Sequence, residues 1–160
     1  MDNFVVTITR SCGSGGSIIA NLLAKQLNIK VYDKELLKLA SDDSGINERL
    51  FAMVDEDTKK SILYKVSKRV YNGELIPPES NDFTSNDNLF NYQAKVLKEL
   101  AKENSYIVIG RGADYVLRDN KNVIKIFVHA NNEECILREM KRLGMERKEA
   151  EEWINKTNIY

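Results

Sequence analysis

The sequence is poor in the residues that build disulfide frameworks and histidine-based metal centres. Its 160 residues include two cysteines, one histidine and two prolines. Cys12 lies in a glycine-rich turn and Cys135 lies far along the chain on a predicted helix, so the pair favours a reducing compartment over a disulfide scaffold. The single histidine, His129, follows a predicted strand and has no other metal-binding residue nearby, which favours a structural role.

Long apolar runs and an excess of charge are also absent. No run approaches the length of a transmembrane helix, and the apolar stretch after Asp2 and Asn3 is too short for a signal peptide. The 24 basic and 24 acidic residues give a formal net charge of zero. This balance gives no support for binding a nucleic acid polymer or an acidic membrane through bulk charge. We therefore expect a cytoplasmic protein with neither of these partners.

What the sequence does contain is an alternation of strand and helix signals. Short, almost wholly apolar runs predict strands, and stretches with apolar residues at helical spacing alternate with them. This alternation is typical of an α/β fold whose parallel sheet is covered on both faces. The length suffices for one core, so we expect a single domain over residues 1–160. The predicted strands are Phe4–Thr9, Lys30–Tyr32, Tyr106–Ile109 and Val123–Val128; the predicted helices run from the glycine turn to Leu27, over Lys34–Ala40, around Leu50–Val54, Ile62–Val70 and Leu89–Ala101, from Asn132 up to Gly144, and over Glu146–Asn155.

The turn at Arg10–Ser17 is the most informative segment. It joins a strand to an apolar-periodic helix, and its glycines let backbone N–H groups point inward beside the positive end of that helix, which suits phosphate. In the usual phosphate loop, G-x-x-x-x-G-K-[ST], Gly15 would be the second glycine and Ser17 the hydroxyl residue. Arg10 stands in place of the first glycine and Gly16 in place of the lysine. On these residues alone the turn is either a variant phosphate loop or a plain glycine-rich connection.

Further motifs follow in order over nearly the whole chain. Together with the turn they are Ile8–Ala20, Val31–Leu37, Ile107–Arg118, Asn122–Ala130 and Arg142–Ala150. This set resembles the cytidylate kinase-like family, a branch of the P-loop nucleoside monophosphate kinases in which glycine at the lysine position is usual. The resemblance implies the P-loop NTPase fold, a three-layer sandwich of a parallel sheet between helices, with a helical lid. Members of the family are generally longer, so a C-terminal truncation is one interpretation of this length.

The resemblance also implies an activity, the phosphorylation of a nucleoside monophosphate by ATP with Mg²⁺. CMP or dCMP would be the acceptor, residues 41–88 the acceptor-side insertion, and residues 138–160 the lid region. Two alternatives remain. The missing lysine, and Ile109 where related kinases often carry an aspartate, favour a nucleotide-binding protein with little or no turnover. The poorly constrained segment 41–88 leaves room for a kinase that acts on another small acceptor. The sequence leaves the base, the sugar and a homodimer open.

Site residues are assigned from the resemblance and from their places at strand ends. Arg111 ends a buried strand, where ligands of open α/β sheets sit, and a guanidinium grips phosphate through two hydrogen bonds. The structural alternatives are a strand-end salt bridge for Arg111, a surface position for Arg10 and a helix N-cap for Asp33. For Gln93 the alternative is a satisfied buried amide, and for the lid arginines it is a solvated helix face. The expected donor-binding residues are Ser11, Cys12, Gly13, Ser14, Gly15, Gly16, Ser17 and Ile18, with the Ser17 hydroxyl on Mg²⁺; the expected catalytic cations are Arg10, Arg111, Arg138 and Arg142; and the expected acceptor-binding residues are Asp33, Gln93, Arg111 and Asp114.

Overall fold

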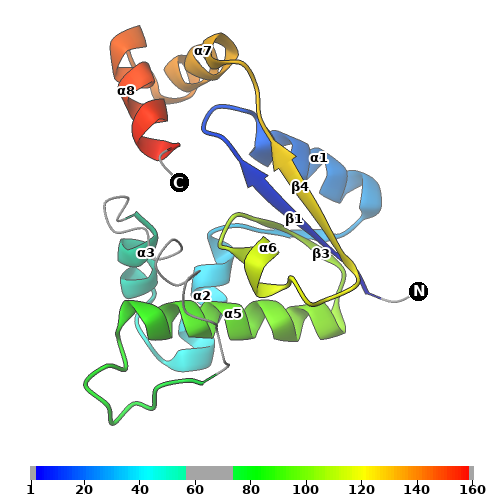
Figure 1. Cartoon of the computed structure of the whole chain (residues 1–160), viewed down its shortest axis with the longest axis vertical. Coiled ribbons are helices and arrows are strands. Elements are labelled where there is room, and N and C mark those ends of the chain that lie inside the picture. The colour runs from blue at the N-terminus through cyan, green and yellow to red at the C-terminus, as the bar shows by residue number, and fades with distance from the viewer. Residues whose placement is uncertain (1–2, 57–73, 159–160) are drawn as a thin grey trace.

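The computed structural model describes residues 3–56 and 74–158, and its centre is a parallel four-stranded sheet (Figure 1). The strands lie in the order β2-β3-β1-β4. The central strands β1 and β3 are buried over most of their length, as their apolar runs predict. The helix predicted at 62–70 lies outside the described residues. The strand bounds are β1 Val5–Arg10, β2 Lys30–Tyr32, β3 Tyr106–Ile109 and β4 Val123–Val128.

Helices cover both faces of this sheet, which confirms the predicted three-layer α/β arrangement. Successive residues of a strand point to opposite faces. Val6 and Ile8 of β1 therefore pack with Ala20 of helix α1 on one side, whereas Val5 joins a larger core on the other side. That larger core includes residues of α2, α3, α5 and α6. The helix bounds are α1 Gly16–Leu27, α2 Glu35–Ser44, α3 Glu48–Glu56, α5 Asn86–Glu103 and α6 Ala113–Val116.

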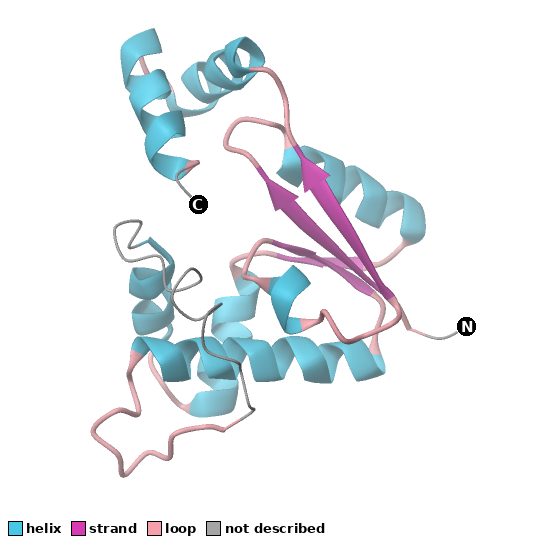
Figure 2. Cartoon of the chain, viewed as in Figure 1, coloured by secondary structure: helices cyan, strands magenta, loops and turns pink. Residues whose placement is uncertain are grey.

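Two more helices, α7 (Asn132–Leu143) and α8 (Arg147–Thr157), form a hairpin beyond the ends of the strands (Figure 2). The arrowheads of β1 and β4 point toward this hairpin, so it lies at the carboxyl edge of the sheet. Gly144 ends α7 in a left-handed conformation, as the sequence predicts. The hairpin has a small core of its own, made of Cys135, Ile136, Ala150 and Ile154.

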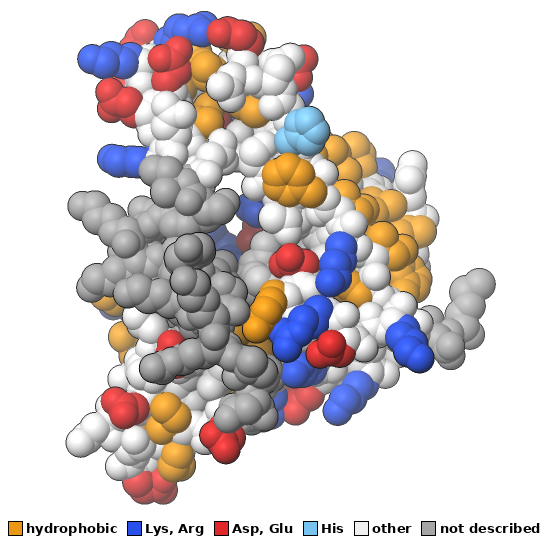
Figure 3. All heavy atoms as spheres, viewed as in Figure 1, with side chains coloured by type: hydrophobic (Ala, Val, Ile, Leu, Met, Phe, Trp, Pro, Cys, Tyr) orange, Lys and Arg blue, Asp and Glu red, His pale blue; other side chains and the backbone are white. Residues whose placement is uncertain are grey.

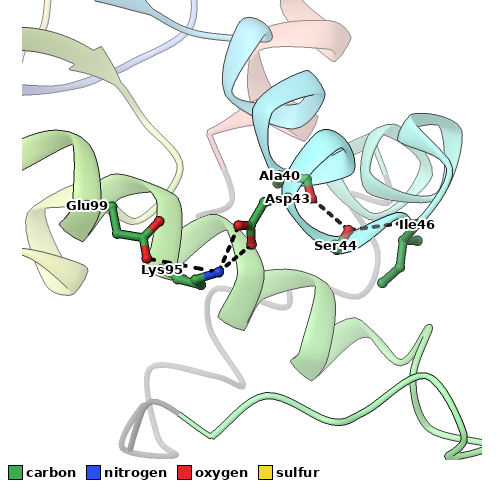
Figure 4. A network of polar contacts seen from close by, with 6 residues as sticks. All are labelled: Ala40, Asp43, Ser44, Ile46, Lys95 and Glu99. Carbon is green, nitrogen blue, oxygen red and sulfur yellow. Dashed lines mark hydrogen bonds and ion pairs between the residues drawn. The ribbon is translucent and has the colours of Figure 1, made fainter.

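Helix α2 is fastened to α5 by polar contacts (Figure 4). The Lys95 ammonium of α5 lies 2.8 and 2.9 Å from the two carboxylate oxygens of Asp43 in α2, and this hydrogen bond raises the pKa of Lys95. At the end of α2 the Ser44 hydroxyl donates to the Ala40 carbonyl and accepts a hydrogen bond from the N–H of Ile46. These contacts hold the end of α2 against α5, while its start follows the carboxyl end of β2 after Asp33 and Lys34.

Exposed apolar side chains gather over α1 and the edge strand β4 (Figure 3). Ile18 and Leu22 of α1 are 62% and 60% exposed, and Phe127 of β4 is 63% exposed. In residues 3–56 and 74–158 no helix combines the length and apolar character that a membrane span requires.

Candidate active site

The glycine-rich turn leaves β1 at Arg10 and enters α1 at Gly16. Gly13 and Gly15 have φ angles of +73° and +85°, a left-handed conformation that disfavours other residues. The N–H of Ser11 donates to the carbonyl of Val128, at 3.0 Å, so the end of β4 holds the start of the turn. Glycine is therefore needed at residues 13 and 15 for the path of the backbone through this turn.

Four backbone N–H groups of the turn, those of Gly13, Gly15, Gly16 and Ser17, make no hydrogen bond within the described part of the chain. Two hydroxyls beside them, on Ser11 and Ser14, are buried and likewise have no hydrogen-bond partner there. Buried polar groups are normally satisfied, so the two hydroxyls are unusual, and together with the neighbouring N–H groups they suit an anionic ligand. Neighbouring N–H groups at a helix N-terminus suit the oxygens of a phosphate chain.

Arg10 extends from the end of β1 across the start of α1. A Cβ atom placed on Gly16 would lie 2.8 Å from Cβ and 2.9 Å from Cδ of Arg10. The far end of the same side chain, Nη1, lies 3.4 Å from the position of a Cβ on Gly110, directly after β3. The Arg10 side chain therefore spans the distance from the glycine-rich turn to the end of the neighbouring strand.

The end of β3 is a second glycine turn. Gly110, Arg111 and Gly112 have φ angles of +67°, +63° and +60°, and the N–H of Ala113 donates to the Gly110 carbonyl. A left-handed conformation costs an arginine about 1–2 kcal/mol, and strain of this kind clusters at functional sites. Arg111 is the residue that carries this strain.

The Arg111 side chain is only 5% exposed, and its Nη2 lies 3.3 Å from Oδ1 of Asp33. Asp33 therefore orients Arg111 instead of capping α2, whose N-cap position is Lys34. The N–H of Asp33 donates to the Glu35 carboxylate. The pKa of Glu35 is lowered by hydrogen bonds from its own N–H and that of Asp33. The strand-end salt bridge considered for Arg111 is thus present, and its role toward an acceptor stays a prediction.

The α7–α8 hairpin holds the glycine-rich turn from outside. Nη1 of Arg138 donates to the Gly13 carbonyl at 3.0 Å, and the N–H of Cys12 donates to Oδ1 of Asn158 at 2.8 Å. Cys135 packs so closely that a Cβ on Gly13 would lie 2.6 Å from its carbonyl oxygen. Sequence reasoning missed Asn158 and Cys135, because neither belongs to a local pattern that points to the turn.

The hairpin gathers both cysteines and both predicted lid arginines near the glycine-rich turn. Cys135 lies far from Cys12 in the sequence, but the fold packs Cys12 against the cluster that contains Cys135. Both thiols are reduced, and burial, together with the Glu139 carboxylate, raises the pKa of Cys12. The Arg142 guanidinium pairs with Glu139, a residue that is almost fully buried. Of the two lid arginines, only Arg138 hydrogen-bonds to the turn, whereas Arg142 acts on Cys12 of the turn through its charge alone.

The remaining predicted residues are less closely placed. Gln93 is 7% exposed on α5, and its amide makes no side-chain hydrogen bond with any described residue, so the satisfied amide that was the alternative is not seen. Asp114 lies in the first turn of α6, directly after the Arg111 turn. Ile18 is largely exposed on α1, although its N–H donates to Gly15. Roles for these three residues stay predictions.

The family model of the cytidylate kinase-like family matches residues 5–159. Among solved structures, an uncharacterized protein from Eubacterium ventriosum ATCC 27560 is similar, with a TM-score of 0.61 and 23% identity over 96% of this chain and 70% of that chain. The protein TT1252 from Thermus thermophilus is similar with a TM-score of 0.50 and 21% identity, over 94% of this chain and 78% of that one. At these identities the two likenesses concern the fold alone. No curated protein matches the sequence. Since the family model covers almost all residues, the chain belongs to the cytidylate kinase-like family.

Proposed function

We propose that the protein transfers the γ-phosphoryl group of ATP to a nucleoside monophosphate, with CMP or dCMP as the preferred acceptor. The observation that carries this proposal is that two turns suited to binding phosphate lie at the same edge of the sheet. The unbonded N–H groups of the glycine-rich turn follow β1, and the strained Arg111 turn follows its neighbour β3. Ligands of parallel sheets bind at this carboxyl edge.

In this proposal the N–H groups of Gly13, Gly15, Gly16 and Ser17 hold the phosphates of ATP. Arg111, oriented by Asp33, binds the phosphate of the acceptor. The unbonded amides and the buried hydroxyls of Ser11 and Ser14 fit a ligand with many acceptor oxygens. Charge neutralisation and positioning are the main requirements of phosphoryl transfer, and both elements supply them.

The transfer itself needs no nucleophilic side chain. An oxygen of the acceptor phosphate, as its dianion, forms a bond to the γ-phosphorus while the bond from that phosphorus to the β,γ-bridging oxygen breaks. The electron pair of the broken bond stays on ADP, and no proton moves in this step. The side chains and amides of this chain only bind, align and neutralise the two phosphate chains.

A magnesium ion fits the site only through ligands shared with the nucleotide. No group of three or more His, Cys, Asp or Glu residues that would hold a metal occurs within residues 3–56 and 74–158. Mg²⁺ in kinases is bound by few protein groups and mainly by substrate phosphates and water. Ser17, at the start of α1, would supply a hydroxyl. When bound, the ion neutralises phosphate charge.

A protein that binds nucleotide without turnover is the second candidate. It is favoured by Gly16 in place of the lysine, and by the apolar Ile109 at the end of β3, 2% exposed, where related kinases often carry an aspartate.

One experiment separates the two candidates. Purified protein is incubated with Mg²⁺ and ATP and, one at a time, CMP, dCMP, UMP, AMP and GMP, and the formation of ADP and of each nucleoside diphosphate is measured. We expect diphosphate from CMP or dCMP. Arg111→Ala should abolish it, because the acceptor phosphate loses its bidentate partner.

Arg118→Ala is the matched control, because the Arg118 guanidinium bonds to the Tyr115 carbonyl and lies over the Tyr115 ring. It should leave the rate unchanged. Saturable binding of ATP with no diphosphate from any acceptor would favour the second candidate.

A further inference from the structure

The residue that stands in place of the phosphate-loop lysine has no room for a side chain. Gly16 begins α1 and is buried, and its φ angle lies outside the left-handed region, so the backbone itself would accept other residues. The obstacle is Arg10. The three atoms nearest to a Cβ on Gly16 are Cβ, Cδ and Cγ of Arg10, at 2.8, 2.9 and 3.3 Å. The aliphatic part of Arg10 therefore fills the space that a side chain at residue 16 would enter.

The charged end of Arg10 has no counterion in the part of the chain that the structure describes. Arg111, Arg138 and Arg142 each pair with a carboxylate. Arg10 makes no ion pair and no side-chain hydrogen bond with any residue that the structure describes. Its Nη1 nevertheless lies close to Gly110, at the turn that carries Arg111. The Arg10 guanidinium thus lies between the glycine-rich turn and the turn that carries Arg111. It has no anionic partner among the described residues.

We infer that Arg10 is the cation of the donor site, and that residue 16 is glycine because Arg10 occupies the place of the lysine side chain. This inference rests on the proposed function. The guanidinium lies between the amides that hold the donor and the turn that holds the acceptor, so it meets the phosphoryl group that is transferred between them. It stabilises the negative charge on that group during transfer, and Arg10 and Gly16 form one mutually dependent pair.

The dependence can be tested by exchange. Arg10→Gly combined with Gly16→Lys changes residues 10–17 to G-S-C-G-S-G-K-S, which is the usual phosphate-loop pattern. Arg10→Gly removes all three atoms that block residue 16. The double variant should therefore accept the lysine, whereas Gly16→Lys alone forces the lysine against the Arg10 side chain.

The measurements are the dissociation constant of Mg²⁺-ATP by calorimetry and, with CMP as the acceptor, the rate of ADP formation. Loss of a charge-assisted hydrogen bond should raise the dissociation constant about 10-fold or more in each single variant. Loss of a preorganised cation should lower the turnover rate about 100-fold or more. The double variant should recover at least about a tenth of the wild-type rate, and bind ATP better than either single variant.

Two controls exclude a trivial loss of folding. Arg10→Gln keeps the aliphatic stem against Gly16 and removes only the charge, so it should melt at the temperature of the wild type yet show the loss of rate. Far-UV circular dichroism and thermal melting of every variant identify any that does not fold.

Equal rates for Arg10→Gln and the wild type would overturn the inference. So would a double variant that binds ATP no better than the worse single variant. Failure of the proposed function has a different signature: the wild type then makes no diphosphate from any acceptor. In that case the cycle of ATP dissociation constants still decides whether Arg10 and Gly16 depend on one another.

Discussion

Gly13→Ala should loosen the contact between the glycine-rich turn and the α7–α8 hairpin. Gly13 has a φ angle of +73°, and the Cβ of an alanine there would lie 2.6 Å from the carbonyl oxygen and 2.8 Å from the Cα of Cys135. These are backbone atoms of α7, so a change of rotamer cannot relieve the clash. Either the turn or the helix must move.

The magnitude follows from two separate costs. A left-handed conformation costs an alanine about 1–2 kcal/mol. Overpacking against atoms that cannot move freely adds about 1–3 kcal/mol. We therefore expect Gly13→Ala to lower the free energy of unfolding by about 2–5 kcal/mol, a large share of the stability of an ordinary domain.

Gly144→Ala is the matched control, because Gly144 has a φ angle of +67° and nothing lies within 4 Å of a Cβ placed on it. It should lower the free energy of unfolding only by the cost of the left-handed conformation, about 1–2 kcal/mol. Urea unfolding followed by circular dichroism measures both losses, and calorimetry with ATP should show weaker binding for Gly13→Ala alone. Equal losses in the two variants, within about 0.5 kcal/mol, would refute the reasoning, since the clash would then cost nothing.

Three other substitutions test single contacts. Asn88→Ala removes a fully buried amide that makes three hydrogen bonds to the backbone before α5, and should lower the free energy of unfolding by about 2–4 kcal/mol in urea titrations. Asp33→Ala takes a carboxylate from the buried Arg111 side chain and should cost about 1–3 kcal/mol by the same assay, less than for a fully buried pair because Asp33 is 36% exposed; no loss would show that the pair does not hold Arg111. Because the pKa of Glu35 is lowered in the folded state, its carboxylate stabilises the fold. This stabilisation is fully present above the usual pKa of 4.5 and is lost as the pH falls through the lowered pKa. The difference in urea midpoint between the wild type and Glu35→Gln should therefore shrink from about pH 6 to about pH 3, and a constant difference would contradict this.

The sheet could be predicted from the sequence because each strand is a short apolar run with its own boundaries. The predicted bounds of β2, β3 and β4 agree with the structure, and β1 differs by one residue at each end. The short helix α6 was not predicted, since four residues are too few to show helical periodicity. Helix boundaries agree less well: α2 runs to Ser44 rather than Ala40, and it ends where Gly45 turns left-handed and its N–H bonds to the Ser41 carbonyl.

The site could be predicted only where its residues are neighbours in sequence or follow strands. The glycine-rich turn and Arg111 satisfy this condition. The contacts of Asn158 with Cys12 and of Cys135 with Gly13 do not, because they join residues more than a hundred positions apart. No local pattern encodes such a contact. Arg10 and Gly16 are close in sequence, but their contact could not be predicted, because it depends on the direction that the Arg10 side chain takes.

Arg10 and Arg111 hold equivalent positions in the register of the sheet, but their side chains have different surroundings. Ile8 of β1 pairs with Ile109 of β3, so Arg10 and Arg111 each come two residues after this pair. The chain at Arg10 is still extended, and its side chain remains exposed without a counterion among the described residues. The chain at Arg111 has already turned into the left-handed region, which directs its guanidinium into the fold and onto Asp33. A cation held in place by a carboxylate suits the binding of an acceptor before reaction, whereas a cation without a carboxylate can give its full attraction to charge on a phosphoryl group in transfer. In the proposed function, one register and two different turns would thus supply both kinds of cation at the same edge.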